Sequence, residues 1–68
     1  KDGLDYYRRI ARDAVPYVKV DGFCAVECGA GQSRDVASIL TASGHFVLQK
    51  IVKDYGGIER VVVFQRKE

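Results

Sequence analysis

The sequence contains no methionine, a single proline, two cysteines and no long apolar run. Spanning a membrane takes about 18 apolar residues in a row, and secretion takes a basic and apolar leader, so the sequence predicts neither a transmembrane helix nor a signal peptide. Because a complete gene product begins with methionine, a chain that opens with Lys1 is expected to come from a longer protein. We therefore expect residues 1–68 to be a soluble, cytoplasmic segment.

The chain is also short, with 68 residues, of which 47% are hydrophobic and 29% are charged. This composition is typical of a globular domain and not of a disordered or membrane segment. A chain of this size buries only about 60% of the surface that its unfolded form exposes, so we expect marginal stability without a partner. The net charge of +2 is too small to indicate a nucleic-acid or membrane surface.

The few cysteine and histidine residues give no basis for a disulfide or a metal centre. Cys24 and Cys28 lie in a predicted strand, roughly 13 Å apart at about 3.3 Å per residue, which is too far for a disulfide. Reduced thiols, as in a cytosolic protein, are therefore predicted. Cys28 and His45 are too few and too scattered for a metal site, because zinc usually needs three or four protein ligands.

The first element is predicted to be a helix, because apolar residues recur with helical spacing from Leu4. Asp2 is predicted to cap this helix, and Asp5 is placed to complement the positive end. Pro16 should kink or end it between residues 15 and 18, before a turn at Asp21 and Gly22. The apolar face comprises Leu4, Tyr7, Ile10, Ala11, Ala14, Val15 and Val18.

The remaining chain predicts a strand, a helix and two further strands. The run Phe23–Val26 is typical of a strand buried on both faces, and a helix should begin at Gln32 or Ser33 and end at Gly44. The segment 46–52 is predicted to be a strand, and Gln49, Lys50 and Lys53 are polar residues that suit a strand at the edge of a sheet. The apolar run Val61–Phe64 predicts an interior strand covered on both faces, paired antiparallel with the one before it.

A glycine-rich loop, Glu27 to Ser33, follows the first strand with acid-x-Gly-x-Gly spacing. Such loops let a backbone approach a nucleotide closely at a helix N-terminus. However, the third glycine of the pattern is missing, and Asp54 follows the wrong kind of element to be the distal acidic residue of such a site. A structural loop is therefore the favoured interpretation, with cofactor binding as the alternative.

Glu27 is the only carboxylate in the apolar strand, and a buried carboxylate is costly unless it is hydrogen-bonded. The favoured interpretation is a structural one, in which Glu27 accepts hydrogen bonds from the N–H groups of Gly29 to Ser33. The alternative is that Glu27 faces a ligand cleft at the carboxyl end of the strand.

The first helix interleaves aromatic and basic residues, namely Tyr6, Tyr7, Arg8, Arg9 and Arg12. Such residues can hold nucleic acid, but a solvated helix face above an aromatic core contact explains them equally well. We expect no direct contact with nucleic acid. No serine, threonine or cysteine has a histidine and an acid at the spacing of a catalytic triad, so no nucleophilic catalytic residue is predicted.

Most of the chain resembles bacterial release factor glutamine methyltransferases, which are class I S-adenosylmethionine-dependent enzymes. The opening phrase Lys1 to Ile10 is similar to the segment that follows the catalytic strand and loop of that family. The chain departs at Val20 to Gly22, where the family has a Pro-Gly-Gly type of turn, and at Cys28, where an aliphatic residue is usual. The similarity continues through Asp21–Phe23, Val26–Gln32, Lys53, Asp54, Gly57 and Arg60–Val62.

This resemblance implies an α/β fold, the C-terminal part of a class I (Rossmann-like) methyltransferase sheet, with about three strands and two helices. Residues 1–68 would be the C-terminal subdomain, residues 22–27 the fifth strand of a seven-stranded sheet, and the last two strands an antiparallel hairpin. The cofactor-binding glycine motif and the Asn-Pro-Pro-Tyr substrate motif of the family lie upstream. No catalytic or S-adenosylmethionine-binding residue is therefore expected in this chain.

The resemblance also implies that the parent protein is an enzyme that methylates the glutamine of the Gly-Gly-Gln motif in peptide chain release factors. This segment would be its inactive scaffold. Without upstream strands, the edge of Phe23–Glu27 would be unpaired, so the isolated chain is expected to self-associate. Two alternatives stay open, a non-catalytic α/β interaction module and a fragment of a nucleic-acid methyltransferase, since the latter shares the fold.

Overall fold

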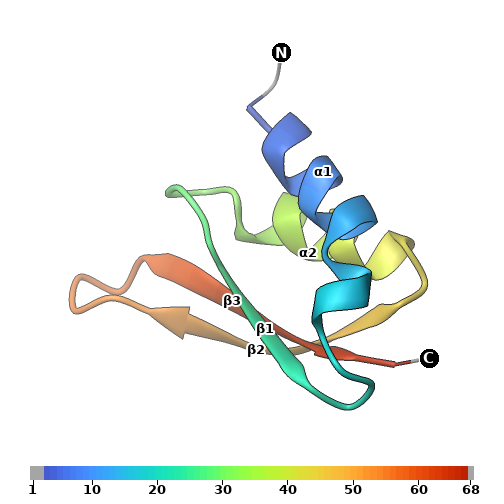
Figure 1. Ribbon diagram of the computed structural model, residues 1–68. Helices are drawn as coiled ribbons and strands as arrows, with labels where there is room; N and C mark the ends of the chain where they lie inside the picture. Colours follow the sequence, from blue (N-terminus) through green and yellow to red (C-terminus); the bar gives the residue numbers. More distant parts are fainter. Residues whose placement is uncertain (1–2, 68) are drawn as a thin grey trace.

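Two helices pack on one face of a three-stranded sheet in the computed structural model, which describes residues 3–67 (Figure 1). The predicted α/β class and the predicted order of helix, strand, helix, strand and strand are confirmed. The elements are α1 (Asp5–Asp13), a short 3-10 helix η1 (Val15–Tyr17), β1 (Phe23–Glu27), α2 (Ser33–Ala42), β2 (Phe46–Lys53) and β3 (Glu59–Arg66).

The sheet has the order β1-β3-β2, and both neighbouring pairs are antiparallel. This arrangement confirms the interior position predicted for Val61–Phe64 and the antiparallel hairpin of the last two strands. Asp54 closes the hairpin by accepting hydrogen bonds from the N–H groups of Gly56 and Ile58 at 2.9 and 3.0 Å. The bond from Ile58 and the Arg60 guanidinium lower the pKa of Asp54.

The core lies between the helices and the face of the sheet beneath them. Phe64, at the centre of β3, is fully buried, and its ring meets the edge of Phe46 with 6.3 Å between the ring centroids. From the apolar face predicted for it, α1 contributes the buried residues Tyr7 and Ala11, and the buried Leu4 comes just before its first residue. The remaining buried apolar residues are Val26, Cys28, Val36, Leu40 and Val62.

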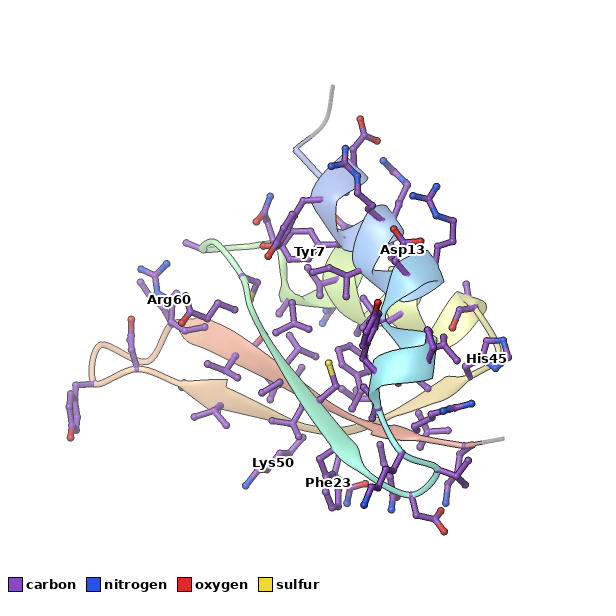
Figure 2. The ribbon with its side chains drawn as sticks, in the orientation of Figure 1. Tyr7, Asp13, Phe23, His45, Lys50 and Arg60 are labelled. Carbon is purple, nitrogen blue, oxygen red and sulfur yellow. The ribbon has the colours of Figure 1, made fainter. Side chains whose placement is uncertain are left out.

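The opposite face of the sheet, here called the open face, has neither helix on it. In Figure 2, Phe23 and Lys50 lie on this side, away from the helices. Phe23 is 62% exposed, and Ala25 and Glu27 of β1 are exposed as well. The prediction that β1 and β3 are covered on both faces is therefore wrong for this chain, because both helices pack on the same side. The apolar residues of the open face include Phe23, Ala25, Val61 and Val63.

α1 ends at Asp13, two residues before the range 15–18 in which Pro16 was expected to kink or end it. The chain continues as η1, with Pro16 in its first turn, where a missing N–H breaks no intrahelical hydrogen bond. Asp21 then adopts a left-handed conformation with φ 68°, which confirms the turn before β1. Asp5 lies in the first turn of α1 as predicted, whereas the cap predicted for Asp2 lies outside the described residues.

The two edges of the sheet differ in how they discourage further pairing. β2 carries Gln49, Lys50 and Lys53, and its register with β3 is irregular at two points, features that typically protect an edge strand. β1 has a regular register and only one charged residue, Glu27. Both predicted edges are confirmed, and the β1 edge is the unprotected one. Within residues 3–67, neither helix has the length and hydrophobicity needed to cross a bilayer.

Candidate functional site

The candidate site is the loop from Glu27 to Ser33, which joins the carboxyl end of β1 to α2. Open α/β sheets bind their ligands at the carboxyl ends of strands, so this loop is where the sequence placed a possible cofactor. α2 begins at Ser33, as predicted, with Gln32 in the N-cap position.

The peptide group between Glu27 and Cys28 is held from both sides. Its N–H, which belongs to Cys28, donates to the Arg60 carbonyl oxygen at 2.8 Å. Its carbonyl oxygen, which belongs to Glu27, accepts a hydrogen bond from the Tyr7 hydroxyl at 3.0 Å. The end of β1 is thus tied to β3 on one side and to α1 on the other.

The next peptide group is held by the side chain of Gln32. The Gly29 N–H donates to Gln32 Oε1 at 3.0 Å, and the Gln32 N–H donates back to the Gly29 carbonyl oxygen at 3.1 Å. A Cβ atom at position 29 would lie 2.9 Å from Gln32 Oε1, so any larger residue there would displace the end of the Gln32 side chain. Gln32 was predicted only as a possible first residue of the helix, although a glutamine three residues after a backbone N–H has the spacing of a capping box.

These contacts decide how the glycine pattern is best interpreted. A loop that binds a nucleotide or S-adenosylmethionine presents unpaired N–H groups to its ligand. Here the Cys28 and Gly29 N–H groups are both engaged by groups of the chain itself. These two N–H groups are therefore not available to a ligand, and their contacts favour the structural interpretation.

Glu27 does not make the contacts predicted for its carboxylate. The Gly29 N–H donates to Gln32, and within residues 3–67 the exposed Glu27 carboxylate has no hydrogen-bond partner. The predicted structural role of this side chain is therefore wrong, because an exposed carboxylate on the open face remains hydrated. Glu27 lines a groove of about 480 Å³ between α1 and β1, together with Tyr6 and Ile10.

Glu59 of β3 also holds the loop, and this contact was not predicted from the sequence. Ser33, which is 5% exposed, donates its hydroxyl to the Glu59 carboxylate, and the Cys28 thiol contacts the Glu59 carbonyl oxygen at 3.6 Å. Burial raises the pKa of the Cys28 thiol, which keeps it protonated and unreactive near neutral pH. Cys24 and Cys28 are both free thiols, as predicted.

The structure separates the two residues considered for a metal site. Cys28 follows the strand end that pairs with Val61, whereas His45 precedes Phe46, which pairs with Arg66 at the other end of β3. In the described part of the chain, no three histidine, cysteine or acidic residues gather as metal ligands would.

Two of the basic residues of α1, Arg8 and Arg12, form local ion pairs on its exposed face. Arg8 pairs with Asp5 at 2.8 Å, and Arg12 pairs with Asp13 at 2.8 Å, which lowers the pKa of Asp13. Tyr7 points inward, and burial raises the pKa of its hydroxyl. This arrangement favours a solvated helix face over a nucleic-acid surface.

Comparison with known proteins gives the family. No protein-family model matches the chain. The release factor glutamine methyltransferase of Agrobacterium fabrum is 46% identical over 66 residues, which cover 97% of this chain. That of Fusobacterium nucleatum is 42% identical over 65 residues, or 96% of this chain. The chain belongs to the release factor glutamine methyltransferase family.

A solved structure agrees with this assignment. The protein-(glutamine-N5) methyltransferase (release factor-specific) of Alicyclobacillus acidocaldarius superposes with a TM-score of 0.66 and 37% identity, over 98% of this chain and 42% of that protein. The predicted family and the predicted fold, part of a methyltransferase α/β sheet, are both confirmed. The chain spans only 22% and 18% of the length of the two curated relatives.

Proposed function

We propose that residues 1–68 are the C-terminal scaffold subdomain of a longer protein that methylates the glutamine side-chain nitrogen of the Gly-Gly-Gln motif in peptide chain release factors. The observation that carries this proposal is the similarity across nearly the whole chain to proteins named release factor glutamine methyltransferases. In this proposal the longer protein works in the cytoplasm, and S-adenosylmethionine, bound outside this segment, supplies the methyl group.

The role of this segment in the proposal is mechanical. β3 inserts antiparallel between β1 and β2 and buries Val62 and Phe64 beneath the helices. The Arg60 carbonyl oxygen of β3 also accepts a hydrogen bond from the Cys28 N–H, so the end of β1 is held at a fixed place. These contacts join elements of the chain to one another, as a scaffold role requires.

The proposal predicts that the 68-residue chain does not bind S-adenosylmethionine, because the family's cofactor motif lies outside it and the Cys28 and Gly29 N–H groups of the loop are already hydrogen-bonded. Isothermal titration calorimetry of the purified chain should show no heat of binding, whereas the longer protein should bind S-adenosylmethionine at a single site. Micromolar binding by the short chain would instead make Glu27 to Ser33 the cofactor loop and would refute the scaffold role.

A further inference from the structure

We propose that Tyr7 and Gln32 are positioning residues for methyl transfer, because together they fix the carboxyl end of β1 relative to the start of α1. This inference rests on the proposed function. Neither residue is required to touch the substrate or the cofactor, and each acts through the backbone that it holds.

Tyr7 provides the first of the two connections. Tyr7 is 8% exposed and lies in the first turn of α1, and its hydroxyl donates to the last carbonyl of β1, that of Glu27. Figure 2 shows Tyr7 near the start of α1, on the side where β1 runs into its loop. Since the same peptide group donates to Arg60 of β3, the hydroxyl sets the distance between α1 and the sheet at this end.

Gln32 provides the second connection. Its Oε1 atom accepts from the Gly29 N–H, and its Nε2 atom lies 3.6 Å from the position that a Cβ atom on Gly3 would occupy. One amide group therefore lies between the loop after β1 and the residue that leads into α1. Gly3 has a φ of 78°, a left-handed conformation that favours glycine at this approach.

These two connections meet where the proposed chemistry takes place. In α/β sheets the ligands lie at the carboxyl ends of strands, which is where the Glu27 carbonyl and the Gly29 N–H are held. By the resemblance, the chain that enters α1 at Gly3 comes directly from the catalytic strand and loop. A shift of α1 against the end of β1 would therefore displace the reacting groups, and a displacement of about 1 Å can cost roughly a hundredfold in rate.

The test uses the longer protein with its release factor substrate and the variants Tyr7→Phe, Gln32→Ala and Gln32→Glu. We expect kcat to fall about tenfold or more in Tyr7→Phe and Gln32→Ala, with the KM for the release factor and the affinity for S-adenosylmethionine unchanged. Gln32→Glu keeps an acceptor for the Gly29 N–H and should recover most of kcat. Tyr6→Phe is the matched control, since Tyr6 is 64% exposed on the same helix, and it should leave kcat unchanged.

The possible outcomes separate this inference from the proposed function. If the unmodified protein transfers methyl groups to the release factor while Tyr7→Phe and Gln32→Ala keep full kcat, the positioning role is wrong. It is also wrong if kcat falls only because the variants are unfolded at the assay temperature, as circular dichroism would show. A longer protein that is folded and inactive on release factors would contradict the proposed function itself, and the inference with it.

Discussion

Replacing Phe64 by alanine is expected to unfold most of the chain at room temperature. Phe64 is fully buried in the central strand and packs edge-on against Phe46. Truncating a buried phenylalanine to alanine costs about 3–5 kcal/mol, because contacts are lost and a cavity remains. A single core in a chain shorter than about 70–80 residues rarely supplies more than about 3–5 kcal/mol in total.

Urea titration followed by far-ultraviolet circular dichroism measures this effect. The unmodified chain should show a cooperative transition, and Phe64→Ala should show little native signal even without urea. Phe23→Ala is the matched control, because it removes the same atoms from a side chain that is 62% exposed. Its midpoint should move by only a small amount, and equal losses in the two variants would contradict the placement of the core.

The isolated chain is expected to self-associate through the free edge of β1. Hydrogen bonds from Cys28 to Arg60 and from Arg66 to Gly22 show which residues of β1 face β3. In an antiparallel ladder the alternate residues turn their N–H and C=O groups outward, and here these are Phe23, Ala25 and Glu27. Tyr7 covers only the last carbonyl, so most of the edge is available to another strand.

Light scattering across a range of protein concentrations measures this association. We expect the mass to rise above the 7.6 kDa of one chain as concentration increases. Ala25→Lys places a charge on the free edge and should return the mass to that of a monomer. Gln49→Lys places the same charge on the β2 edge, which is already protected, and should leave association unchanged. A monomeric mass for the unmodified chain at high concentration would refute this prediction.

Local patterns were sufficient to predict most of the fold. The helical spacing from Leu4 predicted the buried face of α1, because a helix packed on a sheet exposes the opposite side. The consecutive apolar residues Val61–Phe64 predicted the central strand, and the polar residues of β2 predicted an edge. Each of these features depends on residues close in sequence, where periodicity carries the information.

Whether one or both faces of β1 are buried could not be predicted from this chain by itself. Its apolar run indicates a strand between two layers, and such a run is selected in the environment of the whole protein. In the described structure only one layer is present, so Phe23 and Ala25 are exposed. The relatives are several times longer than this chain, and none of that additional length is present here to cover the open face.

The contacts of the loop were predicted only in part. The glycines correctly indicated a tight turn, but the acceptor for the Gly29 N–H proved to be Gln32 and not Glu27. The Tyr7 hydroxyl and the Glu27 carbonyl are separated by 20 positions in sequence, so no local pattern reports their contact. Side-chain to backbone hydrogen bonds of this kind depend on how α1 lies across the sheet.

The proposed methylation of release factors by the longer protein can be tested by isotope labelling. The longer protein is incubated with isotopically labelled S-adenosylmethionine and a purified release factor, and the modified residue is located by peptide mass spectrometry. We expect one methyl group on the glutamine of the Gly-Gly-Gln motif and none on a factor in which that glutamine is replaced. Label that appears on nucleic acid, or on no substrate at all, would contradict it.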